Sequence, residues 1–388
     1  MRMRVTMTLA PFERLLGALD QRQRRRSLQP IAGLDFASND YLGLAGSDLV
    51  RDLALAALRR GVPPGAGAAR LLRGNHDAFA RLEDTAAAHF GSAAALYFGS
   101  GFAANLGLFA GLPAQRDLVL HDALIHASSR DGMRLGTAES RSFAHNDVQA
   151  ARAEIRAWRK TGGTGQVWLA VESLYSMDGD RAPLADFHDL AQECDGFLVV
   201  DEAHATGVWG PQGRGFSAGI AGNERVITLH TCGKALGVQG ALICAAAPVI
   251  QTLINRARSF VYSTAPSPLL AEVLRGVLMA GDELATRRAA LRDRIDRLPG
   301  LLRRLDLAPS GSQIQPIPVA GDAACLALAG RVQARGFDLR PIRSPTVPKG
   351  AERLRLSLTL NTPAEALDAL IAALDPLLQE VRRCPPSS

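Results

Sequence analysis

Short apolar runs alternate with helix-length stretches along the chain from about residue 92 onward. Continuous runs of this length are typical of strands in a mostly parallel sheet that helices cover on both faces. The runs that predict strands are Ala93–Phe98, Leu118–Leu120, Val167–Val171, Phe197–Val200, Val226–Leu229 and Ala241–Cys244. We therefore expect an α/β fold in which ligands bind outside the carboxyl ends of the strands.

The pattern changes near the end of the chain. Apolar positions at helical spacing predict a helical segment from about Ser267 to Leu305. The segments beyond it predict a strand, a helix, an alternating strand and a closing helix, at Ile314–Val319, Cys325–Arg335, Leu354–Leu360 and Pro363–Val381. We expect an N-terminal arm at 1–45, a large domain at 46–283 and a smaller α+β domain at 284–388.

Residues 1–30 have the pattern of a basic helix, with four arginines between positions 22 and 26. A solvated amphipathic helix explains this pattern, and so does an arm that meets an anionic ligand. Nucleic acid would fit the charge, but no interleaved aromatic residues support it, so we expect no nucleic-acid partner.

Composition narrows the class of protein. The 388 residues are 47% apolar and 21% charged, which excludes a disordered chain. The longest apolar run, Ala241–Ile250, is far shorter than the about 20 residues that a membrane span needs. Five scattered cysteines lack metal-ligand spacing and favour a reducing compartment. The sequence predicts a cytoplasmic protein without a signal peptide, a membrane partner or a metal site.

Lysine is scarce in this chain. Of the 44 cationic side chains, 41 are arginines, and the three lysines are Lys160, Lys234 and Lys349. Only an amine that can lose its proton serves as a nucleophile, and arginine cannot do so. Lys160 and Lys349 lie in polar or turn-forming stretches, whereas Lys234 follows a predicted strand among small residues. Lys234 is therefore a candidate Schiff-base lysine.

Two further features accompany Lys234. The glycine turn at Gly99–Asn105 leads from a predicted strand into a helix, and such a turn binds phosphate or serves packing alone. Asp201 ends an apolar run, where a carboxylate pairs with a cation or caps a helix. Lys234 comes 33 residues after Asp201. A phosphate-binding turn, an acid and a lysine together suit pyridoxal phosphate. The lysine can hold the aldehyde of this cofactor, and the carboxylate can keep the ring nitrogen of the cofactor protonated.

Longer motifs carry a resemblance to a known family. They are Phe36–Leu44, Ser100–Asn105, Phe143–Val148, Ser176–Leu184, Val199–Val208, Gly210–Gly215, Thr231–Lys234, Tyr262–Thr264 and Pro345–Thr359. On these motifs the chain resembles the α-oxoamine synthases over about residues 33 to 375. The resemblance implies a fold-type I transferase that depends on pyridoxal phosphate and forms a homodimer.

Three stretches, Phe143–Val148, Ile314–Ile317 and Pro345–Pro348, resemble the biotin-pathway branch of this family. That branch condenses L-alanine with a pimeloyl thioester, on CoA or on an acyl carrier protein, and releases CO₂. The alternatives are a glycine C-acetyltransferase, a 5-aminolevulinate synthase, or a catalytically silent partner subunit. Lys234, Asp201 and His126 are all present, which argues against a silent subunit.

The resemblance also implies roles for individual residues. Lys234 binds the cofactor aldehyde and moves the α-proton, Asp201 pairs with the pyridine nitrogen, His204 contacts the phenolic oxygen, and His126 stacks on the ring. Glu172 helps to organise the site or to move protons. Further cofactor contacts are Gly101 and Phe102 beside the phosphate, Thr231 at the phosphate, and Ser176.

The substrate contacts that the resemblance implies lie at both ends of the chain. Asn39 and Arg355 hold the amino-acid carboxylate, and Thr346 contacts the acyl substrate. Family members often carry an arginine in the N-terminal arm that meets the acyl group. A gapless match puts Gln29 near that place, so Arg25 or Arg26 would have to serve.

Overall fold

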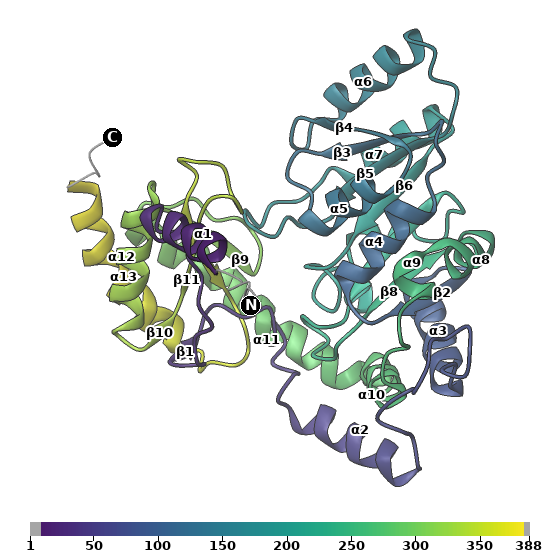
Figure 1. The fold of residues 1–388 in the computed structure, drawn as a ribbon. Coiled ribbons are helices and arrows are strands. Elements are labelled where there is room, and N and C mark those ends of the chain that lie inside the picture. Colours follow the sequence, from purple (N-terminus) through teal and green to yellow (C-terminus); the bar gives the residue numbers. More distant parts are fainter. Residues whose placement is uncertain (1–8, 384–388) are drawn as a thin grey trace, which may run out of the picture.

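A computed structural model describes residues 9–383, and Figure 1 shows a large and a smaller lobe with helix α11 (Gly281–Leu302) between them. The large lobe contains a seven-stranded sheet of order β2-β8-β7-β6-β5-β3-β4. In this sheet β8 runs antiparallel to both neighbours, and the other pairings are parallel. The predicted strands are confirmed as β2 (Ala94–Phe98), β3 (Leu118–Asp122), β5 (Val167–Glu172), β6 (Phe197–Asp201), β7 (Val226–Thr231) and β8 (Ala241–Ala245).

The sequence pattern missed the edge strand β4 (Glu139–Phe143), because four of its five side chains are polar and partly or fully exposed. In the interior strands, successive side chains point to opposite faces and are buried on both. Val199 belongs to the core under helices α4 (Gly101–Gly111) and α8 (Ala247–Arg256). Its neighbour Leu198 belongs to the core under α6 (Val148–Lys160) and α7 (Leu184–Glu193). The expected two-faced α/β architecture is therefore confirmed.

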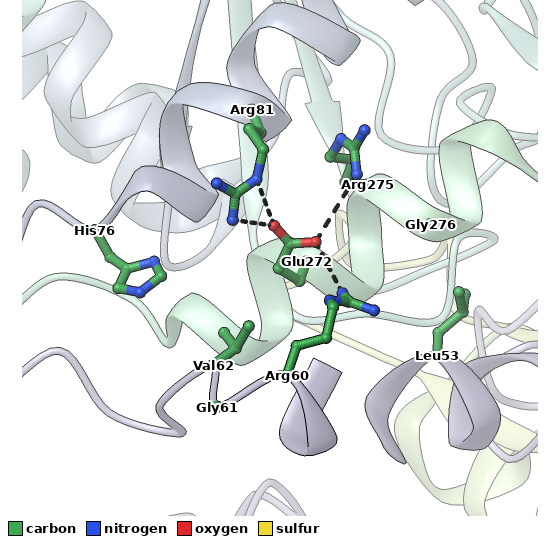
Figure 2. A pocket seen from close by; sticks show the side chains of 9 residues that line it. All are labelled: Leu53, Arg60, Gly61, Val62, His76, Arg81, Glu272, Arg275 and Gly276. Atoms are coloured by element: carbon green, nitrogen blue, oxygen red, sulfur yellow. Dashed lines mark hydrogen bonds and ion pairs between the residues drawn. The ribbon is translucent and has the colours of Figure 1, made fainter. Parts of the chain in front are cut away.

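The predicted helical segment over 267–305 is divided at Ala280 into α10 (Pro268–Met279) and α11. Helix α10 packs against α2 (Asp48–Arg59) and α3 (Asp77–Phe90). Glu272 of α10 is 6% exposed and lies within ion-pair distance of three arginines (Figure 2). The closest nitrogens belong to Arg81 at 2.5 Å, Arg60 at 3.3 Å and Arg275 at 3.9 Å. We call these four residues the Glu272 cluster.

The smaller lobe contains the antiparallel sheet β11-β12-β9 and the parallel pair β1-β10. Its strands are β1 (Leu34–Asp35), β9 (Ile314–Pro318), β10 (Phe337–Asp338), β11 (Arg340–Ile342) and β12 (Arg353–Ser357), and its helices are α12 (Asp322–Gln333) and α13 (Ala366–Arg383). Because β1 pairs with β10, the chain before the large lobe is attached to the C-terminal part. The boundaries expected at 45/46 and 283/284 stay predictions.

Apart from the first helix of the chain, which is described below, the remaining elements are short. They are α5 (Ala127–Leu135), α9 (Arg258–Val261), and the 3₁₀ helices η1 (Pro211–Gly213), η2 (Phe216–Gly219) and η3 (Arg303–Leu305). Between residues 9 and 383, no helix is both long enough and apolar enough to cross a membrane.

The predicted helix over 1–30 is wrong beyond α1 (Ala10–Gln21), and its residues 1–8 lie outside the described part of the chain. Gln23 adopts a left-handed backbone conformation with φ of 54°, which turns the chain away from the helix. Arg24 then forms an ion pair with Asp322 of α12 at 3.1 Å. The basic segment after α1 therefore lies against the smaller lobe.

Candidate active site

A cavity of about 520 Å³ lies at the carboxyl ends of β5, β6 and β7, where the α/β rule places a ligand. Nine of the predicted site residues line it: Asn39, Gly101, Phe102, His126, Glu172, Asp201, His204, Thr231 and Lys234. Lys234 reaches this cavity, whereas Lys160 and Lys349 do not line it. The structure therefore brings these nine predicted residues together around one cavity.

Lys234 begins a series of hydrogen bonds that runs through the buried Tyr41 and ends at Asn39, another residue that lines the cavity. Its Nζ lies 3.0 Å from His204 Nε2, and His204 Nδ1 lies 2.6 Å from the Tyr41 hydroxyl. The Tyr41 hydroxyl donates to Asn39 Oδ1 at 3.1 Å. His204 Nδ1–H therefore donates to Tyr41, and Nε2 accepts from Lys234.

The pKa values of Lys234 and His204 suit proton transfer between hydrogen-bonded groups. Burial lowers the pKa of Lys234 to about 8, against the opposing pull of Asp201 and Glu172. Burial and then the charge of Lys234 lower the pKa of His204 well below its usual value. Lys234 is therefore close to losing its proton at neutral pH, and His204 is neutral.

Asp201 is fixed by a side chain of α4 and by a backbone N–H of the turn that follows β6. Its Oδ2 accepts from Asn105 Nδ2 of α4 at 3.0 Å, and its Oδ1 accepts from the Ala203 N–H at 2.9 Å. The Asn105 amide also donates to Ser128 Oγ at 3.0 Å, which lies 2.7 Å from His126 Nδ1. Asn105 thus links Asp201 to His126, the residue predicted to stack on a cofactor ring.

Asn105 and Tyr41 bond site residues, but no role for either was predicted from the sequence. A signal was present for Asn105, because it lies one helical turn after Gly101 and so faces the same side of α4. Tyr41 belongs to the motif at Phe36–Leu44, but its partner His204 lies 163 residues further along the chain. Only the fold brings these two side chains together.

Glu172 is the last residue of β5 and pairs in register with Asp201 on β6. It is 2% exposed, and its Oε1 has no hydrogen-bond partner among the described residues. Burial and then the nearby charge of Asp201 raise the pKa of Glu172 to about 8. Glu172 therefore holds a proton at neutral pH beside the cavity, where a bound molecule can use it.

The amino end of α4 forms a cradle for an anion. Ser100 Oγ caps the helix by accepting from the Ala103 N–H at 3.1 Å. A Cβ on Gly101 would lie 2.4 Å from the Thr231 methyl carbon, so glycine allows the helix end to approach Thr231. Free N–H groups and the helix dipole there favour phosphate. With Lys234, Asp201 and the unpartnered Glu172 oxygen, the donor set fits pyridoxal phosphate.

Three predicted residues do not line the cavity: Ser176, Arg355 and Thr346. Arg355 Nη2 donates to Asn39 Oδ1 at 3.0 Å, so these two predicted carboxylate contacts do lie together. Arg355 Nε donates to the backbone oxygen of Ser176 at 2.5 Å. Ser176 therefore acts on Arg355 through its carbonyl in this structure.

Thr346 is exposed in the segment after β11, and Arg26 Nη2 donates to its hydroxyl at 3.4 Å. Arg25 pairs with Asp20 at 2.8 Å, and Gln29 donates to Ser27 at 2.7 Å. Of the three arm residues considered for the acyl group, Arg26 is therefore the one beside Thr346.

Comparison with known proteins gives the family. The model of class I and II aminotransferases matches residues 32–374. The chain belongs to this family. An 8-amino-7-oxononanoate synthase of Herminiimonas arsenicoxydans is 39% identical over 373 residues, covering 91% of this chain and 94% of the relative. The family resemblance and the fold class expected from the sequence are confirmed.

Solved structures share the fold of this chain. An 8-amino-7-oxononanoate synthase from Francisella tularensis has a TM-score of 0.74 at 25% identity, with 90% of this chain and 98% of that chain covered. A serine palmitoyltransferase from S. paucimobilis, solved with a bound PLP–myriocin aldimine, has a TM-score of 0.86 at 20% identity, covering 96% and 99%. The second likeness is evidence of the fold alone.

Proposed function

We propose that this chain is a pyridoxal-phosphate-dependent acyltransferase of biotin biosynthesis. It condenses L-alanine with a pimeloyl thioester to give 8-amino-7-oxononanoate, CO₂ and the free thiol. The observation that carries this proposal is a full-length relationship, 39% identical over 373 residues, to a synthase of that name. The convergence of Lys234, Asp201, His126 and His204 on one cavity supports an active enzyme and argues against a silent subunit.

When bound, pyridoxal phosphate supplies an aldehyde for an amine and a protonated ring that withdraws charge from the α-carbon of the amino acid. The amino end of α4 and Thr231 would hold its phosphate, and Asp201 would keep the ring nitrogen protonated. Lys234, with its pKa lowered to about 8, takes the α-proton and returns it.

Arg355 and Asn39 would bind the alanine carboxylate. Arg355 is 6% exposed, and its guanidinium is already oriented by Asn39, Tyr41 and the Ser176 carbonyl, so little conformational freedom is lost on binding. A guanidinium grips a carboxylate through paired hydrogen bonds. This grip fixes the α-carbon beside Lys234, with Glu172 available as a proton source on the same edge of the sheet.

For the acyl donor, we propose that Arg26 and Thr346 meet the pimeloyl group, because they lie within hydrogen-bonding distance of each other. The thiol is carried by CoA or by an acyl carrier protein. We further propose a cytoplasmic homodimer, as the family resemblance implies.

The test of this function is turnover of purified enzyme with each amino acid and thioester, followed by CO₂ release. We expect product from alanine with pimeloyl-CoA or pimeloyl carrier protein. Strong turnover of glycine with acetyl-CoA or succinyl-CoA, and none of alanine, would overturn the proposal in favour of the glycine-dependent enzymes.

A further inference from the structure

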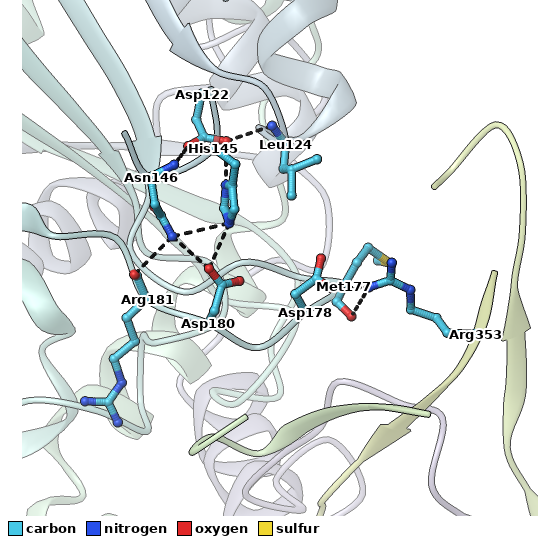
Figure 3. A network of polar contacts seen from close by, with 9 residues as sticks. All are labelled: Asp122, Leu124, His145, Asn146, Met177, Asp178, Asp180, Arg181 and Arg353. Carbon is cyan, nitrogen blue, oxygen red and sulfur yellow. Dashed lines mark hydrogen bonds and ion pairs between the residues drawn. The ribbon is translucent and has the colours of Figure 1, made fainter. Parts of the chain in front are cut away.

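A second ionic cluster lies outside the cavity, centred on His145 of the motif Phe143–Val148 (Figure 3). His145 Nδ1 lies 2.9 Å from Asp122 Oδ1, and Nε2 lies 2.8 Å from Asp180 Oδ2. Asp122 is fully buried at the end of β3 and also accepts from the N–H groups of Leu124 and Asn146. The imidazole therefore bridges a rigid sheet edge and Asp180, which belongs to a loop.

The His145 imidazole is positively charged at neutral pH. Burial alone would lower the pKa of His145, but the hydrogen bonds and charges of Asp122 and Asp180 outweigh it and raise the pKa to about 10. Both ring nitrogens then carry protons, so His145 donates to both carboxylates. The edge of the ring also meets Tyr175, with centroids 4.5 Å apart and planes at 88°.

The loop at 175–180 is held between His145 and the smaller lobe. Its ends are tied by the Tyr175 N–H, which donates to the Asp180 carbonyl at 2.9 Å. Gly179 has φ of 71°, and a Cβ there would lie 2.2 Å from the Ile314 carbonyl of β9. The loop therefore has no room to move toward β9. On its other side, Asp180 is held by His145 and by Asn146 Nδ2, which donates to Asp180 Oδ2 at 2.7 Å.

Between these two supports, the loop carries the groups that orient two arginines of β12. The Ser176 carbonyl accepts from Arg355 Nε at 2.5 Å, and the Met177 carbonyl accepts from Arg353 Nη1 at 3.4 Å. Asp178 also forms an ion pair with Arg353, as Figure 3 shows. A shift of this loop would thus rotate the Arg355 guanidinium away from Asn39.

We propose that His145 is a positioning residue whose two ring nitrogens bond Asp122 and Asp180, and that it thereby holds the 175–180 loop so that Arg355 faces the amino-acid carboxylate. This inference rests on the proposed role of Arg355 in amino-acid binding. It gives a function to the Phe143–Val148 motif, no residue of which lines the cavity.

The test uses the cofactor-loaded, full-length enzyme with His145→Gln, which can serve one carboxylate but carries no charge. Asp180→Asn is the second variant, because it keeps the shape of a side chain that is 37% exposed and so preserves folding. The matched control is His188→Gln, since His188 contacts Asn223 at the amino ends of β6 and β7, far from the loop.

We expect the KM for alanine to rise about 10- to 100-fold in both variants, because a small misplacement of a binding group costs this much. The KM for the pimeloyl thioester, the cofactor affinity and the thermal midpoint of Asp180→Asn should stay close to wild type. An unchanged KM for alanine in Asp180→Asn, or equal losses for both substrates, would overturn the proposal.

A failure of the proposed function is separable from a failure of this inference. Amino-acid binding is measured directly, by titrating alanine, glycine and serine into the loaded protein and following the cofactor absorbance. If wild type binds an amino acid but makes no 8-amino-7-oxononanoate, the function is wrong while the role of His145 is still decided by the affinity of its variants.

Discussion

Two groups of charged side chains, each built around a buried carboxylate, differ in how their polar atoms are paired. In the Glu272 cluster, three guanidinium groups surround one carboxylate, and both of its oxygens are bonded. Around Lys234, two carboxyl groups, an amine and two histidines face a cavity, and one oxygen of Glu172 has no hydrogen-bond partner within residues 9–383. The first arrangement stabilises three helices, whereas the second keeps charges available for a bound molecule. A buried titratable group with an unsatisfied oxygen and a shifted pKa therefore marks the site better than a buried ion pair does.

The largest effect is expected at Lys234. Lys234→Arg keeps a positive charge but removes an amine that can lose its proton. We expect kcat to fall by about 10³-fold or more, within the range for loss of a positioned acid–base group. Steady-state kinetics of product formation, with circular dichroism as the check on folding, measure this. Residual activity within tenfold of wild type would mean that the amine does not take part.

The next effect is expected at the Glu272 cluster. Glu272→Gln leaves three arginines around a neutral amide, and we expect the free energy of unfolding to fall by about 1–3 kcal/mol. The kcat of the folded enzyme should not change, because the cluster does not line the active-site cavity. Denaturant unfolding and kinetics of the same variant test both statements.

The control for Glu272 is Asp368→Asn, which removes an exposed ion pair with Arg297 whose side chains are 45% and 47% exposed. Surface pairs contribute little, so the change should be below about 0.5 kcal/mol. A loss of kcat in Glu272→Gln without a loss of stability would contradict the structural role of the Glu272 cluster, since the cluster would then serve catalysis.

The smallest effect per pH unit concerns the pH dependence of stability in the cofactor-free protein. The pKa of Glu172 rises from 4.5 to about 8 on folding, so the folded state binds an extra proton between these values. The free energy of unfolding therefore decreases as pH rises through this window, by at most about 1.4 kcal/mol per pH unit. Glu172→Gln should lack this decrease.

Denaturant unfolding of wild type and Glu172→Gln across pH 4.5 to 8 measures this difference. Glu224→Gln, an exposed glutamate before β7, is the matched control and should follow wild type. Parallel curves for wild type and Glu172→Gln would show that Glu172 is already ionised in the fold.

The sequence predicts the strands well because a buried parallel strand requires a continuous apolar run. It misses β4, since an exposed edge strand carries no such signal. Lys234 and Asp201 are visible because a charge at the end of an apolar run is unusual. The role of Asn105 is harder to predict, because it depends on a hydrogen bond to Asp201, which lies 96 residues further along the chain. The end of α1 is missed because the contact of Arg24 with Asp322 is tertiary.

The scarcity of lysine provides the most direct test of the central claim, that the Lys234 amine binds the cofactor aldehyde. The purified protein is loaded with pyridoxal phosphate, reduced with borohydride, digested and mapped by mass spectrometry. The account predicts a pyridoxyl label on Lys234 and none on Lys160 or Lys349. A label on either of those two lysines, or an unlabelled Lys234 in a fully loaded protein, would contradict it.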